Sequence, residues 1–342
     1  MNADYCKSIL SMPEIENLSL KNQLSNKHFA FQPLFISLME SDMLKTKLPL
    51  SLPVLALPIL LAIASAVIVD KSTNAQVVCK IKPTSVVSSV NQAKCLLREP
   101  RIWGEVSPGL TSLPSPLDRL LSLPNIDVTK QQLRTYLAAH NIQEKDIGGS
   151  LDEPVSRTNN NAPNAEFARY FIIHDTSTPN YNNKPFPADI NQVSWAFNNL
   201  NNYGSGERSP AHIIINRLGQ SVTRKNFNTP WRSTQRESND NCGVNQCKGL
   251  FLGVELVQPR RSSPNGPSGN DAISPDPGFT TIQLKRLALV YIAASIRRGK
   301  CLIPVFHVAL DKGVNGGSHD DPQKFNLDQW AEQINVLLTE IR

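Results

Sequence analysis

From residue 165 to the C-terminus, short apolar runs alternate with stretches in which apolar residues recur every three or four positions. The short runs predict buried strands at residues 169–175, 212–217, 220–225, 250–257 and 303–307. The periodic stretches predict helices at residues 189–200, 281–298 and 326–341. Such alternation of strands and helices predicts an α/β fold, with helices on the faces of a sheet.

The part of the chain before residue 165 has a different composition. Residues 76–165 are rich in proline, glycine, serine, threonine and asparagine, and one helix is readable at residues 129–140. We therefore expect a loop-rich N-terminal segment with one helix at 76–165, followed by the main domain at 166–342.

An uncharged stretch at residues 48–69 precedes both parts. Lysines come before it and small residues after it, which is the layout of an export signal. We expect a signal peptide at 43–75 or, if it is not cleaved, a signal anchor that tethers the protein to a membrane through 48–69. Three prolines within the stretch favour cleavage, so the expected location is the periplasm, the cell envelope or the exterior. Residues 1–42, upstream of this signal, form an extension of doubtful meaning.

The cysteines are compatible with an exported protein. Cys242 and Cys247 are close enough in sequence for a local disulfide, and a bridge between Cys79 and Cys95 is a second possibility. Cys301 then remains as a buried thiol. A zinc knuckle at the first pair is not expected, because it would need a second pair of ligands.

The overall composition is that of a globular protein. Of the 342 residues, 40% are hydrophobic and 19% are charged, which excludes a disordered or fibrous chain. The net charge of +6 suits an anionic polymer as partner. Nucleic acid is not expected, because the chain has no basic stripe interleaved with aromatic residues.

Candidate chemistry lies at the ends of two predicted strands. His174 and His307 each end an apolar run, and a loop after His307 leads to His319, Asp320 and Asp321. Two imidazoles and one carboxylate, with a fourth position left for water, make a typical catalytic zinc shell. From spacing alone the alternative stays open that each histidine is a structural hydrogen-bonding group.

Five short motifs occur in an order that is typical of one enzyme family. They are Phe171-Ile-Ile-His174, Ala211-His-Ile-Ile-Ile-Asn-Arg-Leu-Gly-Gln220, Thr229-Pro-Trp231, Leu252-Gly-Val-Glu255-Leu256, and His307 followed by Asp321-Pro322. In these motifs residues 169–342 resemble the zinc-dependent N-acetylmuramoyl-L-alanine amidases of the AmpD and peptidoglycan-recognition type. The resemblance implies a central mixed β-sheet flanked by helices.

The resemblance also implies a zinc ion and its ligands, His174, His307 and Asp321. The family pattern has an acidic residue directly before proline, which selects Asp321 over its neighbour Asp320 and over Asp311. The loop between His307 and Asp321 is longer than in compact members, so Asp320 stays the alternative third ligand.

Further roles follow from the same motifs. Glu255 matches a glutamate that acts on the nucleophilic water, and His319 stands where many members have a lysine that steadies the oxyanion. His212 is expected to be structural or to line the substrate site, Trp231 to form a pocket wall, and Arg232 to contact substrate where many relatives have histidine.

The implied activity is zinc-dependent hydrolysis of the amide between N-acetylmuramic acid and L-alanine in peptidoglycan or muropeptides. The alternative is a recognition protein that binds wall fragments without cutting them, as relatives lacking a metal ligand do. The complete ligand set in this sequence favours the enzyme.

Overall fold

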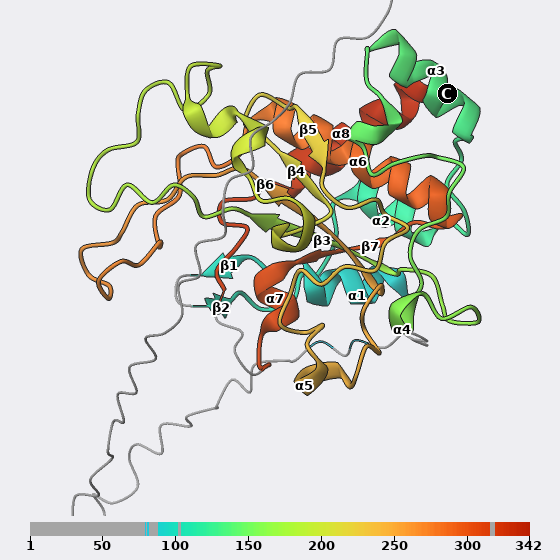
Figure 1. Ribbon diagram of the computed structural model, residues 1–342, viewed down its shortest axis with the longest axis horizontal. Coiled ribbons are helices and arrows are strands. Elements are labelled where there is room, and N and C mark those ends of the chain that lie inside the picture. The colour runs from blue at the N-terminus through green and yellow to red at the C-terminus, as the bar shows by residue number, and fades with distance from the viewer. Residues whose placement is uncertain (1–78, 80, 82–87, 102–103, 315–318) are drawn as a thin grey trace, which may run out of the picture. The chain divides into compact units, whose positions relative to one another are not determined.

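The computed structural model describes residues 79, 81, 88–101, 104–314 and 319–342 (Figure 1). All of them belong to one unit of the chain, Ser72–Arg342. The expected extension at 1–42 and the signal or anchor at 43–75 lie outside the described residues. Within the described ranges, no helix is long and apolar enough to cross a membrane.

A five-stranded mixed sheet forms the centre of the domain, in the order β5-β4-β6-β3-β7. The strands are β3 (Tyr170–Asp175), β4 (Ile213–Ile215), β5 (Ser221–Thr223), β6 (Phe251–Leu256) and β7 (Ile303–Phe306). Four strands, β4, β6, β3 and β7, run parallel to one another, whereas β5 is antiparallel to β4. The expected α/β fold with a central mixed sheet is thus confirmed. β7 is an edge strand and contains Pro304.

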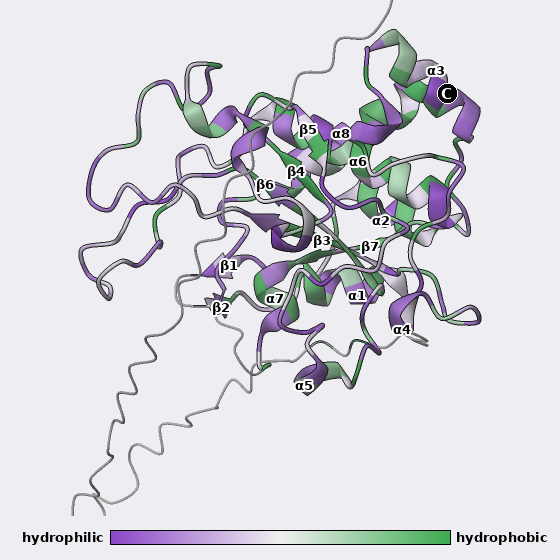
Figure 2. Cartoon of the chain, viewed as in Figure 1, coloured by the Kyte–Doolittle hydropathy of each residue, from purple (hydrophilic) through white to green (hydrophobic). Residues whose placement is uncertain are grey.

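Helices cover both faces of this sheet. Successive residues of β3 point to opposite faces. The Tyr170 hydroxyl donates a hydrogen bond to Gln92 Oε1 in α1 (Ser89–Leu96), while the ring of Phe171 packs edge-on against Tyr291 in α6 (Thr281–Arg298). α1 and α6 therefore lie on opposite faces, and the strands between them are largely hydrophobic (Figure 2).

The two long helices end where the sequence predicts. α6 begins with a capping box between Thr280 and Gln283 and ends at Gly299, whose φ of 79° is left-handed. α8 (Leu327–Ile341) packs against α6 and buries Trp330, Ile334, Leu337 and Ile341. These caps and the apolar face are readable from local sequence, which explains why the predicted helices at 281–298 and 326–341 agree with α6 and α8.

The N-terminal segment is more helical than expected. Besides α3 (Lys130–Ala139), which lies within the predicted helix, it contains α1, α2 (Ser115–Ser122) and a 3-10 turn η2 (Glu144–Asp146). The element labelled α4 (Thr158–Asn161) is a turn, in which Asn159 and Asn160 have positive φ angles of 52° and 55°. A small hairpin joins β1 (Pro100–Arg101) to β2 (Glu105–Val106). The prediction of one helix is therefore wrong. α1 and α2 have only eight residues each, too few for a clear period, and they are stabilised by packing against β7 and α8.

The predicted helix at 189–200 is also wrong. This region forms turns and the short 3-10 helices η3 (Ala196–Asn198) and η4 (Leu200–Asn202), followed by η5 (Gly206–Arg208). Its apolar residues do not share one helical face, because Ile190 is buried while Val193 is 87% exposed. Ile190 and Trp195 instead pack with Ile214 in a small satellite core.

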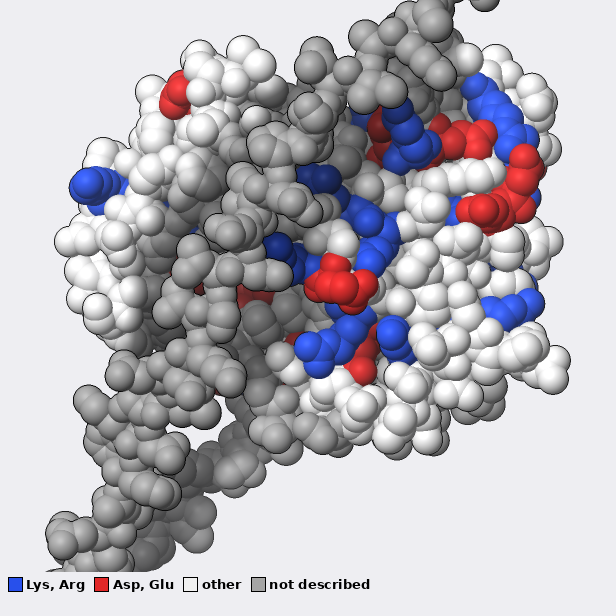
Figure 3. Space-filling model, viewed as in Figure 1, with Lys and Arg blue, Asp and Glu red and all other residues white. Residues whose placement is uncertain are grey.

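Two disulfides match the pairings read from sequence. Cys79 is bonded to Cys95 in α1, and Cys242, at the end of α5 (Asn239–Cys242), is bonded to Cys247. Cys301 is a buried free thiol. On the face drawn in Figure 3, acidic and basic side chains are intermixed.

Candidate metal centre

Three polar side chains meet at the carboxyl ends of adjacent parallel strands. His174 near the end of β3 is the register partner of Glu255 in β6. In β7, Phe306 pairs with Ile173, and His307 follows as the first residue of the short helix α7 (His307–Asp311). The predicted strand at 303–307 thus ends one residue early, so that His307 turns out of the sheet. Ligands of open α/β sheets commonly bind at this edge.

Asp321 completes the group from the loop before α8. Its Oδ1 is 3.0 Å from His307 Nδ1, and its Oδ2 is 3.5 Å from His174 Nδ1. The backbone N–H of Asp175 donates to the same Oδ2 at 3.3 Å. The potential ligand atoms of His174, His307 and Asp321 all lie within 4.8 Å of one another, and all three residues are buried.

The ionisable side chains of this group shift one another's pKa values. Burial alone would lower the pKa of His307, but the carboxylates of Asp321 and Asp311 outweigh it and raise the pKa to about 10. Burial would likewise raise the pKa of Asp321, but the charge of His307 and the hydrogen bonds from both histidines hold it well below its ordinary range. Burial and the neighbouring charge of His307 lower the pKa of His174 to about 4. The centre therefore pairs a carboxylate with one neutral imidazole and one that retains a proton.

The donor set fits a divalent metal such as zinc. Both histidines present Nδ1 to the Asp321 carboxylate, and nitrogen and carboxylate oxygen are the ligand types that zinc takes in catalytic sites. A metal would replace the proton between His307 and Asp321, since metal ligands bind in their deprotonated forms.

The group lies in a cleft of about 430 Å³. Loops that follow β3 and β6 form part of its wall: Ser177 and Ser209 come from one, and Asp271 from the other. Figure 1 shows both long loops projecting from the same side of the domain, and a bridge between Asn180 and Arg260 joins them. The centre can therefore be reached by a substrate lying in the cleft.

Glu255 lines the same cleft and is almost fully buried. Burial, with the charges of Asp321 and Asp175, raises the pKa of Glu255 to about 8. Its Oε2 has no hydrogen-bond partner in the described part of the chain. A buried carboxyl group with a free oxygen and a pKa near neutrality is suited to exchange a proton with a bound reactant.

No family model and no curated protein matches the chain. Among solved structures, it is similar to one described as a selenomethionine derivative of AmpD. The identity is 19%, the match covers 55% of this chain and 98% of that one, and the TM-score is 0.31. A likeness of this extent carries no information on activity.

His319 lies at the rim of the centre. Its ring stacks on that of His307 with the centroids 4.1 Å apart, and its Nδ1 is 3.9 Å from Asp321 Oδ1. The side chain is 43% exposed. Burial and the charge of His307 lower the pKa of His319, so the neutral ring is favoured.

The three residues expected to contact substrate have different environments. Arg232 is exposed and lines the cleft. His212 is fully buried, accepts a hydrogen bond from Gly253 N–H at Nδ1 and bonds the Thr229 carbonyl through Nε2, which fits the structural alternative. Trp231 is half-buried, donates from its indole to the Ser209 carbonyl and lies under the Lys225 ammonium. Neither His212 nor Trp231 lines the cleft beside the candidate ligands.

Asp320, the alternative ligand, does not join the group. Its carboxylate accepts a hydrogen bond from Gln323 Nε2 at 2.8 Å. Burial and the charge of Asp271 raise the pKa of Asp320 to about 7. The geometry thus favours Asp321 as the third member.

Two acidic residues near the centre were not given a role by sequence reasoning. Asp175 forms a buried ion pair with Arg260 and accepts a hydrogen bond from the Gln323 N–H at 3.0 Å. Asp311 contacts His307 Nε2 at 3.0 Å. The only sequence signal for Asp311 is its position, one helical turn after a candidate ligand.

Proposed function

We propose that this protein is an exported zinc-dependent N-acetylmuramoyl-L-alanine amidase that acts on peptidoglycan or muropeptides. One observation carries the proposal: the two Nδ1 atoms and the Asp321 carboxylate converge in a cleft that also holds Glu255. The five ordered motifs of the sequence support the type of reaction, which is hydrolysis of this amide. Export rests on the signal-like stretch alone.

The proposed metal would be held by His174, His307 and Asp321. A zinc ion there would supply a Lewis acid that lowers the pKa of water to about 7. The protein must provide the remaining proton transfer and the orientation of the substrate.

Glu255 is the proposed proton carrier. Its unpartnered Oε2 would accept a proton from the attacking water and deliver it to the departing nitrogen of L-alanine. The raised pKa suits both steps, because a group with a pKa near the working pH can gain and lose a proton readily.

His319 and Arg232 are the proposed substrate contacts. The partly exposed ring of His319 can donate a hydrogen bond to the oxygen that gains charge during attack. Arg232 places a cation on the cleft wall, where it would bind a carboxylate of the stem peptide.

The test is cleavage of defined muropeptides by the purified protein, with and without a zinc chelator, followed by mass spectrometry. We expect release of stem peptides that begin with L-alanine, abolished by the chelator and restored by added zinc. Tight binding of muropeptides without cleavage by the zinc-loaded protein would favour the recognition protein instead. Failure to bind zinc would reject the metal centre itself.

A further inference from the structure

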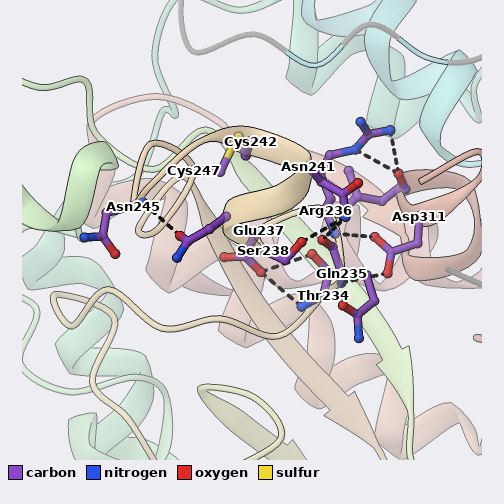
Figure 4. The surroundings of a disulfide bond; sticks show 12 residues. Thr234, Gln235, Arg236, Glu237, Ser238, Asn241, Cys242, Asn245, Cys247 and Asp311 are labelled. Atoms are coloured by element: carbon purple, nitrogen blue, oxygen red, sulfur yellow. Dashed lines mark hydrogen bonds between the residues drawn. A yellow bond between two sulfur atoms is a disulfide. The ribbon is translucent and has the colours of Figure 1, made fainter. Parts of the chain in front are cut away.

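Asp311 is a buried carboxylate that joins a candidate metal ligand to a wall of the cleft. It is 1% exposed and ends α7, one helical turn after His307. Its Oδ2 is 3.0 Å from His307 Nε2. The same carboxylate accepts hydrogen bonds from the backbone N–H groups of Gln235 and Arg236, each at 2.9 Å (Figure 4).

The contact with His307 determines which ring nitrogen faces the cleft centre. A carboxylate accepts a proton but has none to offer when ionised, so it favours a hydrogen on Nε2. With the hydrogen held on Nε2, Nδ1 is the nitrogen that can exchange its proton for a metal lying between Asp321 and His174. Carboxylates that hold the second nitrogen of a metal-binding histidine in this way fix both its tautomer and its ring orientation.

The other two contacts hold a loop. Gln235 lines the cleft together with Arg232, Ser233 and Thr234. Glu237 folds this loop on itself by accepting hydrogen bonds from the N–H groups of Ser233 and Thr234. Figure 4 shows Asp311 reaching the loop from α7, and the disulfide between Cys242 and Cys247 lies further along the same segment.

His307, Asp311 and His319 also lie close enough together to be considered as a second metal group. The hydrogen bonds of Asp311 argue against it. Oδ1 already accepts from Arg236, and Oδ2 accepts from both Gln235 and His307. A metal on Asp311 would have to displace these buried donors and leave backbone N–H groups unsatisfied, which is costly.

We infer that Asp311 is a positioning residue of the metal centre, which orients His307 for zinc and anchors the loop 232–237 beside it. The inference rests on the proposed function only in assuming that His307 is a zinc ligand. Asp311 would not touch the metal or the substrate. It acts by restricting the orientation of the His307 imidazole and the position of the loop 232–237.

The first test is the zinc affinity of Asp311→Asn, measured by competition with a chromophoric chelator. Asparagine keeps the shape but replaces one acceptor oxygen with a donor, so it cannot accept from all three N–H groups. We expect zinc binding 10- to 100-fold weaker, the range that loss of such a partner usually causes.

The matched control is Arg236→Ala. The Arg236 side chain donates hydrogen bonds to the Leu310 carbonyl at 3.3 Å, so its loss weakens the same junction between the loop and α7. The contact between the Asp311 carboxylate and His307 Nε2 stays in place. We expect zinc affinity to stay at the wild-type value. Equal loss in Arg236→Ala and Asp311→Asn would overturn the positioning role in favour of general packing.

A second measurement needs no variant. Long-range ¹H–¹⁵N spectra of the zinc-loaded wild-type protein should show His307 with its hydrogen on Nε2. A hydrogen on Nδ1, or wild-type zinc affinity in Asp311→Asn, would overturn the inference while the proposed function stands. A wild-type protein that binds no zinc would instead reject the proposed function.

Discussion

His174 and Glu255 are register partners on the parallel strands β3 and β6, so both side chains leave the sheet on the same face. Parallel pairing brings together two residues that are 81 positions apart in the sequence (255 − 174). His307 joins them because β7 ends level with Ile173. The pairing of three strands thereby sets the spacing between the candidate metal ligands and the candidate proton carrier.

The ligand assignment predicts that His174→Ala, His307→Ala and Asp321→Ala each lose bound zinc and amidase activity together. Each removes one of only three protein ligands, and zinc sites need a complete set. Metal content after dialysis and muropeptide cleavage measure the two effects. Asp320→Asn serves as the control, because Asp320 is held by Gln323 outside the group. Stoichiometric zinc in Asp321→Ala would contradict the assignment.

Glu255→Gln should separate metal binding from turnover. The variant keeps the size of the side chain but cannot carry a proton, so we expect a loss of kcat of about 10²- to 10⁴-fold. Zinc content and muropeptide affinity should remain at the wild-type level. Unchanged kcat would remove Glu255 from the mechanism, whereas loss of zinc would show that it acts on the metal.

Glu237 should make the fold sensitive to alkaline pH. Burial raises the pKa of its carboxyl from 4.5 to about 8, although N–H groups of Ser233 and Thr234 bond to it. Between these values the folded state keeps a proton that the unfolded state has lost, so stability declines as pH rises through this window. Glu237→Gln cannot lose a proton and should reduce the decline.

Urea unfolding at pH 5, 7 and 9 measures this effect. Glu166→Gln is the control, since it makes the same substitution at an exposed side chain. A Glu237→Gln variant whose stability falls as steeply as that of the wild type would contradict the prediction.

Gly253 in β6 leaves room for the cleft wall. A Cβ atom there would overlap with Ser233 Oγ and lie 2.9 Å from Ser233 Cβ. Gly253→Ala should therefore push the loop outward and cost about 1–3 kcal/mol of unfolding free energy, the range for overpacking. The double variant Gly253→Ala, Ser233→Gly removes both crowding atoms and should recover most of that loss. Thermal unfolding of the wild type, Gly253→Ala, Ser233→Gly and the double variant tests the coupling, and additive losses in the double variant would exclude it.

The sequence was most informative where local patterns decide the structure. The capping box and Gly299 define α6, and apolar runs that end in histidine place His174 and His307 at the rim of the sheet. The failure at 189–200 has a tertiary cause, because Ile190 and Trp195 pack against Ile214 of β4 and Val257, directly after β6, rather than forming one helical face.

Asp311 could not be found in the same way. Two of its three hydrogen-bond donors are backbone N–H groups about 75 positions earlier in the chain, and every residue except proline has such a group. Residue type therefore carries no signal for this contact. The same holds for the environment of His212, which is set by the Gly253 N–H and the Thr229 carbonyl.

Pro304 in the edge strand β7 has a consequence for self-association. The Ile303 N–H bonds to the Arg169 carbonyl on the β3 side, so the alternation along the strand turns the nitrogen of Pro304 to the open edge. Proline has no hydrogen to donate there. A strand from a second molecule that paired with β7 would lack the hydrogen bond at Pro304, which disfavours extension of the sheet from one copy to the next.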